Sequence, residues 1–325
     1  MKKLGLITIL MAFLVSQNYR LPVETGHLLS SVFCEHRPDH FHSGIDIKTN
    51  KKNGYPLFAV LGGYILRVRV SPLGYGRVVY LKLEDGNSAV YAHMDAFIPE
   101  IENRVRKRQQ ETDNASVDVY FSPDEFPIKK GEIIGYSGNT GTIHSHLHFE
   151  IRDAKQRPLN PLKYLKIRDS VSPIFKKIAV VPLSENANVN SHSEIITLDC
   201  QPEGGNRYKI FQPIEATGKI GFSLLTWDGA DDVNNFYHHY SVEFFVDDTL
   251  VFSSAYDKFS FSQTRKINWE RNFSLMVQSK HKFQNLYFSN QKKLPFHSGG
   301  NGVLNLSVGE HDFTIVVEDF NGNSA

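Results

Sequence analysis

The segment His42-Ser43-Gly44-Ile45-Asp46 places two potential metal ligands four residues apart. In an extended backbone alternate side chains share one face, so the side chains of His42 and Asp46 are expected to point the same way. Gly44 lies between them on that face and adds no side chain that would crowd an ion. Alone, this pair is more typical of polar residues scattered over a solvated sheet face, because a catalytic zinc ion needs about three protein ligands.

The segment His146-Leu147-His148 offers the third ligand. Its two histidines also share one face of a strand, and strand parity does not decide which of them binds the metal. A further histidine, His93, stands at the end of an earlier strand-like segment, Tyr91-Ala92-His93. These segments together predict a zinc site with an open coordination position, formed by His42, Asp46 and one member of the histidine pair. The helical His-Glu-x-x-His motif is absent from the sequence, which excludes a helix-borne site of that type.

Extended elements are needed to position these side chains, and the pattern of the first half predicts them. Short runs of β-branched and aromatic residues are separated by Gly, Asn and Asp, which favours β structure. The Asp85-Gly86 pair predicts a tight turn between two of these strands. The predicted strands are Gly63–Val70, Arg77–Leu83, Ser88–His93, Val117–Phe121 and His146–Arg152.

One segment interrupts the β pattern. Ile98, Ile101 and Val105 stand at helical spacing, which predicts a short surface helix over Ile98–Gln110. The helix lies inside an insertion, residues 96–129, that follows His93 directly. We therefore expect this insertion to form one wall of a substrate groove.

The second half of the chain predicts a separate domain without a catalytic motif. A linker is expected over Ile167–Pro173, and short strands with turn residues between them then recur, which predicts an immunoglobulin-like β-sandwich. The sequence ends shortly after a strand and turn, so we expect the sandwich to be truncated at its C-terminus. The predicted strands are Lys177–Val181, Glu194–Leu198, Lys219–Leu225, Ser241–Val246, Leu250–Ser253 and Phe313–Val317.

Four blocks of the first half resemble the lysostaphin/LytM-type zinc metallopeptidases, which are peptidoglycan endopeptidases. The blocks are Phe41–Ile47, Tyr91–His93, Gly131–Gly135 and His146–Glu150, and the resemblance covers about residues 30–165 in order and spacing. It implies that His42, Asp46 and His148 are the zinc ligands, and that His93 and His146 are catalytic histidines that do not bind zinc. It also implies one zinc ion per chain and a small antiparallel sheet crossed by a groove.

Two positions depart from the family pattern or bear on the site. The family usually has Gly-Pro before its His-Leu-His run, whereas this chain has His144-Ser145. His144 shares the face of His146 and His148, and we expect it at the exposed rim, with a competing ligand as the alternative. Cys34 lies just upstream of His42 and is expected to be a buried thiol. The only other cysteine is Cys200, far away in the sequence, so two unpaired thiols are expected.

Length, charge and the N-terminal residues limit the class of protein. The chain has 325 residues, enough for two domains, and a net charge of +1, which gives no reason to expect a nucleic acid partner. A basic start and a short apolar run predict a signal peptide over residues 1–17, with a membrane anchor as the alternative. The predicted organisation is mainly β: a signal peptide, a zinc metallopeptidase domain over residues 18–168 and the sandwich over residues 169–325. We expect an exported, extracytoplasmic or periplasmic protein with no stable membrane insertion.

The predicted function is zinc-dependent hydrolysis of peptide crosslinks in peptidoglycan. Both the substrate and the reaction are implied by the family resemblance and not by ligand spacing. The alternatives are a catalytically silent LytM-type scaffold that binds peptidoglycan or activates another wall hydrolase, and a zinc-stabilised peptidoglycan-binding module. Intact ligand positions favour the enzyme, because some relatives of the family that act as scaffolds have lost them.

Overall fold

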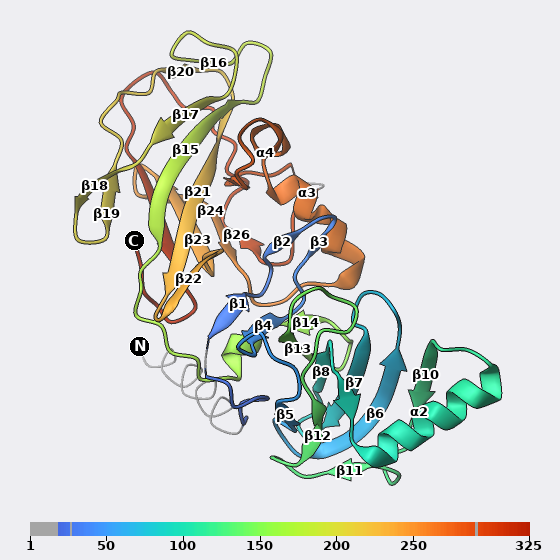
Figure 1. Cartoon of the computed structure of the whole chain (residues 1–325). Coiled ribbons are helices and arrows are strands. Elements are labelled where there is room, and N and C mark those ends of the chain that lie inside the picture. The colour runs from blue at the N-terminus through green and yellow to red at the C-terminus, as the bar shows by residue number, and fades with distance from the viewer. Residues whose placement is uncertain (1–18, 27, 290–291) are drawn as a thin grey trace, which may run out of the picture. The chain divides into compact units, whose positions relative to one another are not determined.

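The computed structural model describes residues 19–26, 28–289 and 292–325 (Figure 1). The predicted signal peptide, residues 1–17, lies outside the described residues. The chain divides into two compact units. The first unit contains the described residues up to Phe33 and Ser43–Arg168, and the second contains Cys34–His42 and Asp169–Ala325. The chain is mainly β, as expected from its sequence.

A nine-stranded sheet dominates the first unit, and its central strands carry the segments of chemical interest. Neighbours along the main path are antiparallel, in the order β1-β4-β13-β8-β7-β6-β10, while β11 pairs with β6 and β14 pairs with β13. The strands are β1 (Leu29–Ser31), β4 (Ile45–Lys48), β6 (Gly63–Val70), β7 (Arg77–Leu83), β8 (Ser88–Ala92), β10 (Val117–Tyr120), β11 (Pro127–Ile128), β13 (His146–Arg152) and β14 (Pro158–Leu159).

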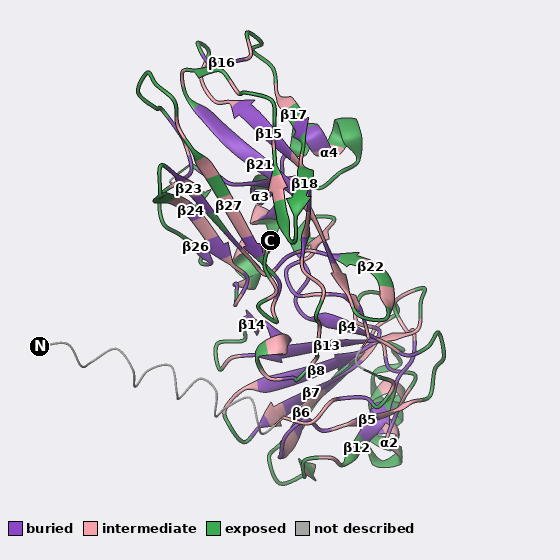
Figure 2. Cartoon of the chain, turned by 90° about the vertical axis from the view of Figure 1, so that its left-hand side faces the viewer, coloured by how far each residue is buried: buried purple, intermediate pink, exposed green. Residues whose placement is uncertain are grey.

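The middle of this sheet is buried on both faces. Figure 2 shows β7, β8 and β13 almost wholly in the colour of buried residues. β7 and β8 are runs of Val, Tyr, Leu and Ala with little polar alternation, as expected for strands covered on both sides. β13 instead alternates polar with apolar residues, and its polar residues His148 and Glu150 are buried as well. The turn between β7 and β8 contains Asp85 and Gly86, and Gly86 has a φ of +89°, which glycine adopts without a steric penalty. The predicted hairpin is therefore confirmed.

Smaller elements surround this sheet. A three-stranded sheet has the order β5-β12-β9, and a 3-10 helix, η1 (Pro161–Lys163), follows β14. The predicted surface helix is present as α2 (Pro99–Thr112), which buries Ile101 and Val105 and lies beside β10 (Figure 1). The strands of the small sheet are β5 (Pro56–Phe58), β9 (Ala96–Phe97) and β12 (Ile133–Tyr136).

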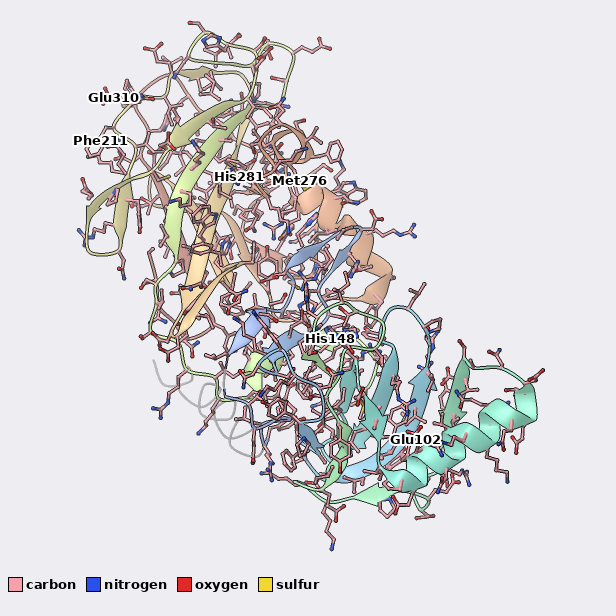
Figure 3. All side chains as sticks on the ribbon, viewed as in Figure 1. Glu102, His148, Phe211, Met276, His281 and Glu310 are labelled. Atoms are coloured by element: carbon pink, nitrogen blue, oxygen red, sulfur yellow. The ribbon has the colours of Figure 1, made fainter. Side chains whose placement is uncertain are left out.

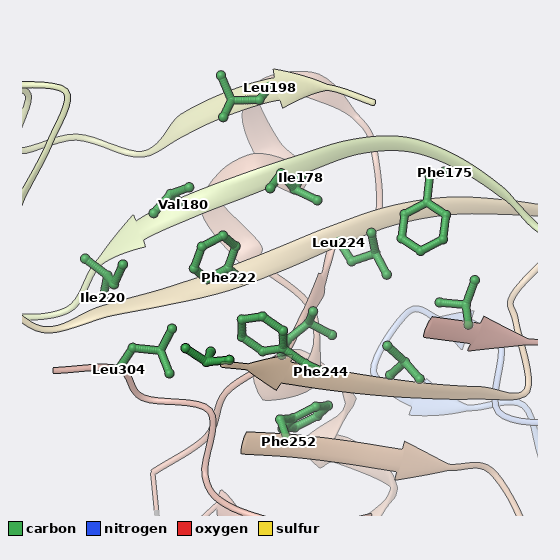
Figure 4. Packing of buried hydrophobic residues seen from close by; sticks show 14 of the residues in the cluster. Phe175, Ile178, Val180, Leu198, Ile220, Phe222, Leu224, Phe244, Phe252 and Leu304 are labelled. Atoms are coloured by element: carbon green, nitrogen blue, oxygen red, sulfur yellow. The ribbon is translucent and has the colours of Figure 1, made fainter. Parts of the chain in front are cut away.

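Two sheets of the second unit share one hydrophobic core. One sheet has the order β17-β15-β21-β22 with β25 against β21, and the other has the order β26-β24-β23-β27. Figure 4 shows Ile178, Phe222 and Leu224 from the first sheet and Phe244 and Phe252 from the second within this core. The immunoglobulin-like strand arrangement stays a prediction. The strands are β15 (Ile174–Pro182), β17 (Ile196–Asp199), β21 (Ile220–Ala230), β22 (Val233–Tyr237), β23 (Ser241–Val246), β24 (Thr249–Ala255), β25 (Gln284–Asn285), β26 (His297–Ser298) and β27 (Phe313–Glu318).

The sequence pattern did not predict a helical stretch between β24 and β25. Three short helices stand there, in a region whose apolar residues are interspersed with polar ones without a clear period. Asn272 caps the last of them, because its side chain accepts a hydrogen bond from the backbone N–H of Leu275 at 3.2 Å. The helices are η2 (Phe261–Lys266), α3 (Ile267–Glu270) and α4 (Phe273–Ser279). Two further strand pairs are β16 (Asn188–Val189) with β20 (Ala216–Thr217) and β18 (Gln201–Gly204) with β19 (Arg207–Lys209).

A two-stranded hairpin, β2 (His36–Arg37) with β3 (His40–Phe41), belongs to the second unit although it precedes most of the first in sequence. The ring of Phe41 lies against Phe259 and Phe296, with centroids 5.4 and 5.6 Å away, and only 1% of Phe41 is exposed. Its backbone N–H also donates to Oγ1 of Thr264 at 3.0 Å. This hairpin is therefore held by aromatic packing and a hydrogen bond within the second unit.

Both cysteines are free thiols in the second unit, Cys34 fully buried and Cys200 partly buried. Burial raises the pKa of the Cys34 thiol well above its usual value, which keeps the thiol protonated and unreactive. In the described part of the chain, no helix has both the length and the apolar character needed to span a bilayer.

Candidate metal centre

Three of the predicted residues come together in space. His42, Asp46 and His148 each offer one ligand atom, and these three atoms all lie within 4.8 Å of one another. All three side chains belong to buried residues, with exposed fractions of 5%, 7% and 5%. His42 directly follows β3, Asp46 lies on β4 and His148 on β13, where Figure 3 labels it.

The pairing of β4 with β13 explains why two of these side chains meet. Asp46 lies directly opposite His148 in the antiparallel register, so both side chains leave the sheet on one face. Gly44, directly before β4, allows the backbone at this position to lie close to the backbone of β13. A Cβ atom at this position would lie 2.2 Å from the carbonyl oxygen of Phe149. Gly44 is therefore required by contact with the neighbouring strand, which is a stronger constraint than the space for an ion expected from the sequence.

Hydrogen bonds on both sides of the ring fix the orientation of His148. Its Nδ1 lies 2.9 Å from Oδ1 of Asp46, and its Nε2 lies 2.9 Å from Oε1 of Glu150. Burial disfavours the charged ring, but the bonds to Asp46 and Glu150 outweigh it and raise the pKa of His148 to about 9. A metal ion at this site would displace the proton from Nδ1; with Nε2–H still donating to Glu150, Nδ1 is the nitrogen directed at the Asp46 side of the site, where a ligand atom is needed.

Glu150 is a buried residue of the site that the sequence analysis did not assign a role. It is fully buried, and its carboxylate accepts hydrogen bonds from Oγ of Ser43 at 2.7 Å, from Nε of Arg152 at 2.6 Å and from the hydroxyl of Tyr75. Burial would raise the pKa of Glu150, but Arg152 and His148 together hold it well below its usual range. The available sequence signal was its position two residues after His148, on the same face of the strand.

His146 and His93 lie beside the three-residue group, in contact with each other. Their ring centroids are 4.7 Å apart, and that of His93 is 5.8 Å from that of His148. Nδ1 of His146 lies 2.8 Å from the carbonyl oxygen of His144, and Nε2 lies 3.5 Å from Oδ1 of Asp46. All five histidine and aspartate positions expected at the site are therefore close together.

A backbone carbonyl also orients His93. Its Nδ1 lies 2.9 Å from the carbonyl oxygen of Thr140, and a neutral ring can donate there only from Nδ1–H, which leaves Nε2 as the basic nitrogen. Burial, followed by the charges of His148 and His146, lowers the pKa of His93 to about 4. This ring is therefore neutral near pH 7, as a proton acceptor must be.

Thr140 is a second residue that the sequence analysis did not identify. Its hydroxyl accepts a hydrogen bond from the backbone N–H of Arg77 at 2.9 Å and donates to the carbonyl of Met94 at 2.8 Å. These two bonds fix the loop whose carbonyl oxygen, that of Thr140, accepts the hydrogen bond from His93. No spacing rule would have found Thr140, because it acts through its backbone and lies 47 residues from His93.

The donor set fits a zinc ion. Two imidazole nitrogens and one carboxylate oxygen are ligands that zinc accepts, and three protein ligands leave a position open for reaction. His144 is exposed, and Cys34 is buried in the second unit. Neither belongs to the group of ligand atoms that lie within reach of one another among the described residues.

Comparison with known proteins identifies the family of this chain. The model of peptidase family M23 matches residues 40–110. Lipoprotein NlpD of Yersinia enterocolitica is 30% identical over 115 residues, which cover 35% of this chain and 94% of that protein. The chain therefore belongs to peptidase family M23, the family of the lysostaphin/LytM-type peptidases.

Two longer relatives match this chain over only part of their own length. Murein hydrolase activator NlpD of Escherichia coli is 32% identical over 127 residues, 39% of this chain and 27% of that protein. DD-carboxypeptidase/endopeptidase Mpg of Neisseria meningitidis is 30% identical over 122 residues, 37% of this chain and 22% of that protein. The catalytic domain of lysostaphin from Staphylococcus simulans has 21% identity and a TM-score of 0.30, over 42% of this chain and 89% of that domain. The chain thus spans about a quarter of the length of the longer relatives.

Proposed function

We propose that this protein is a zinc-dependent endopeptidase that hydrolyses peptide crosslinks of bacterial peptidoglycan. The observation that carries the proposal is the complete group of His42, Asp46 and His148, with two further oriented histidines beside it. A scaffold that only binds a partner has no need of this full set of ligand and proton-transfer groups.

His42, Asp46 and His148 would hold the zinc ion. When bound, zinc supplies Lewis acidity, which polarises a peptide carbonyl and makes water a better nucleophile near neutral pH. Glu150 keeps the His148 ring in the orientation that directs Nδ1 toward Asp46. The protein thereby orients its ligands before any substrate enters.

His93 and His146 would transfer protons and stabilise the negative charge on the carbonyl oxygen. Each ring has its Nδ1 within hydrogen-bond distance of a backbone carbonyl, which leaves Nε2 to act on the substrate side. Among neutral side chains, imidazole is best suited to exchange protons near pH 7. We assign the two tasks to the pair jointly.

The substrate class is inferred from the relatives. Mpg is named as a DD-carboxypeptidase and endopeptidase, and NlpD as a murein hydrolase activator. Both names refer to cleavage of the cell wall, which supports peptidoglycan stem peptides or crosslinks as the substrate here. Such a substrate requires export across the cytoplasmic membrane, in agreement with the predicted signal peptide over residues 1–17 and an extracytoplasmic or periplasmic location.

Mass spectrometry of muropeptides tests this function. The zinc-loaded full chain is incubated with purified peptidoglycan, with and without a chelator, and the soluble products are identified. Crosslink cleavage that stops with chelator and returns with zinc is expected. The absence of new peptide termini with fully zinc-loaded protein would refute the enzyme.

Two variants separate zinc binding from proton transfer. His148→Ala removes a ligand, so zinc content measured by atomic absorption should fall to background together with activity. His93→Ala leaves the three ligands in place, so zinc should remain bound while turnover falls by about 10²–10⁴-fold, the usual contribution of a general acid or base. Full turnover by the His93 variant would remove this residue from the mechanism.

Activation of another wall hydrolase is the second candidate function. The name of the Escherichia coli relative, murein hydrolase activator NlpD, favours it, and a protein of this kind needs a shaped surface more than an intact metal site. If His148→Ala stimulates a partner hydrolase as strongly as the unmodified chain does, the activator role holds. Loss of stimulation together with loss of zinc would tie any such effect to the metal centre.

A further inference from the structure

A second group of carboxylates lies in the second unit, among described residues that the proposed peptidase chemistry does not use. Asp169 is the residue at which the chain enters this unit again after Arg168, Asp228 lies on β21, and Asp319 directly follows β27. One carboxylate oxygen from each residue lies within 4.8 Å of the other two. Three segments far apart in sequence therefore converge on one point.

Backbone and side-chain donors hold two of these carboxylates in place. Oδ1 of Asp319 accepts from the backbone N–H groups of Asn321 and Asn323, both at 2.8 Å, and Oδ2 accepts from Nδ2 of Asn323 at 2.6 Å. Oδ1 of Asp169 accepts from the backbone N–H of Val171 at 3.0 Å. Nδ2 of Asn323 also donates to the carbonyl oxygen of Asp169 at 2.9 Å, which joins the two segments.

Asp228 has no such donors among the described residues. Only 5% of the residue is exposed, and its Oδ1 is buried without a hydrogen-bond partner in the described structure. No ion pair joins it to a Lys or Arg side chain among the described residues, and its two charged neighbours are Asp169 and Asp319. An ionised carboxylate in this environment lacks compensation for its lost hydration, which costs several kcal/mol unless a cation or a proton is present.

We propose that Asp169, Asp228 and Asp319 form a binding site for a calcium ion. Three carboxylates supply hard oxygen ligands and an excess of negative charge, and the group contains no histidine or cysteine, so zinc is not the metal it selects. Calcium accepts six to eight oxygens in flexible geometry, whereas magnesium usually retains its waters and takes one or two carboxylates. The unpartnered oxygen of Asp228 then gains the positive partner that the protein itself does not offer.

A proton is the competing occupant of this site. Burial, followed by the charges of Asp319 and Asp169, raises the pKa of Asp228 to about 9. A protonated Asp228 would remove the buried charge without any metal. Asp228→Asn reproduces that neutral form with almost the same shape, so this variant distinguishes the two occupants.

Calcium binding would link the start of the second unit to its two sheets. Asp169 belongs to the segment that leads into β15, Asp228 belongs to one sheet, and Asp319 follows the edge strand of the other. An ion that binds the folded unit but not the unfolded chain stabilises the folded unit, and this stabilisation grows with the logarithm of the free ion concentration above the dissociation constant. Calcium therefore should stabilise the second unit against heat and proteolysis.

Calcium titration of the chelator-treated full chain tests the site. Isothermal calorimetry should give a dissociation constant in the range of about 10⁻⁴–10⁻³ M, typical of extracellular calcium modules. The midpoint of thermal unfolding should rise by several degrees at saturating calcium. Asp228→Asn should weaken binding at least tenfold, whereas Asp248→Asn, the same change at an exposed residue of the same unit, should bind as the unmodified chain does.

Terbium luminescence provides a second measurement of the site. Tb³⁺ occupies calcium sites, and Trp227, adjacent in sequence to Asp228, should sensitise its emission. Calcium should displace the terbium signal, and Trp227→Phe should reduce it. Absence of both the calcium-dependent unfolding shift and the terbium signal, or equal calcium affinity in Asp228→Asn, would overturn the calcium site. The same titration on His148→Ala should be unchanged, so the result is independent of the peptidase centre.

Discussion

Each functional side chain of the candidate metal centre depends on a partner that holds its ring or carboxylate in one orientation. His148 has Asp46 on one side and Glu150 on the other, and His93 has the carbonyl of Thr140. Such outer partners tune metal affinity because they fix the tautomer and direction of the ligand. Glu150 is the most consequential of them, because its buried carboxylate also accepts a hydrogen bond from Arg152.

Glu150→Gln tests this orienting role. The change keeps the size of the side chain but removes the charge that faces His148 and Arg152, so zinc affinity should fall by about 10–100-fold. Competition with a chromogenic chelator measures the affinity, and zinc content should still reach one ion per chain at high zinc concentration. Glu125→Gln, at an exposed position, is the control. Unchanged zinc affinity in the Glu150 variant would leave this carboxylate without a role at the metal centre.

The buried residue His297 of the second unit should make the folding stability depend on pH. Burial, followed by the charge of Lys293, lowers the pKa of His297 to about 4, and its Nδ1 accepts from the backbone N–H of Leu294. Between about pH 4 and 6.5 the unfolded chain binds a proton at this residue that the folded chain does not. Its contribution to stability is therefore complete above about pH 6.5 and is lost as the pH falls toward 4.

Urea unfolding at pH 7 and pH 5 measures this effect. At about 1.4 kcal/mol per pH unit, His297 should account for roughly 2 kcal/mol of lost stability at pH 5. His297→Asn keeps an acceptor near the position of Nδ1 but does not titrate, so the loss between the two pH values should shrink by that amount. An equal loss in the variant and the unmodified chain would mean that other groups dominate.

At the scale of elements, one antiparallel pairing brings the site together. The register of β4 with β13 places Asp46 opposite His148, and a slip by one residue would move one side chain to the other face of the sheet. The backbone around Gly44 packs against Phe149 with no room for a side chain. The geometry of the ligands therefore depends on a contact between main chains.

Gly44→Ala should disturb that pairing. The added methyl group would lie 2.2 Å from the carbonyl oxygen of Phe149, so the strands must separate, and both zinc affinity and thermal stability should fall. Gly62→Ala is the matched control, because the nearest atom there is a side-chain oxygen of the exposed Glu84, which can move away. Zinc binding by titration and unfolding by circular dichroism measure both effects. Equal tolerance of the two substitutions would contradict the packing argument.

At the scale of the whole molecule, the residue before a proposed ligand is part of the core of the second unit. Phe41 packs against Phe259 and Phe296, and His42 follows it directly in the chain. The hairpin that carries Phe41 is grouped with the second unit. Packing of Phe41 thus fixes the chain directly before His42.

Phe41→Ala should therefore weaken zinc binding although it removes no ligand. The lost packing should cost about 3–5 kcal/mol of stability, and the freed segment would hold His42 less firmly. Phe252→Ala, in the same unit but far in sequence from every proposed zinc ligand, is the control and should lose comparable stability with unchanged zinc affinity. Equal zinc affinities in the two variants would argue against this anchoring.

The sequence alone was sufficient for the β-rich class, the β7–β8 hairpin, the helix α2 and the residues that meet at the metal centre. These features depend on local patterns: alternation along strands, a turn dipeptide, helical spacing and short motifs. The family resemblance then selected His148 from a pair that strand parity could not separate. Helices α3 and α4 carried no comparable local signal, since their residues are specified mainly by packing within the second unit.

Tertiary structure alone decided which distant residues support the site. Glu150 and Thr140 orient the two histidine rings, the β2–β3 hairpin joins the second unit, and Asp169, Asp228 and Asp319 converge from three segments. None of these relations has a fixed spacing along the chain. A hydrogen bond or a shared charge depends on separation in space, and that separation is set only when the sheets pack and register is fixed.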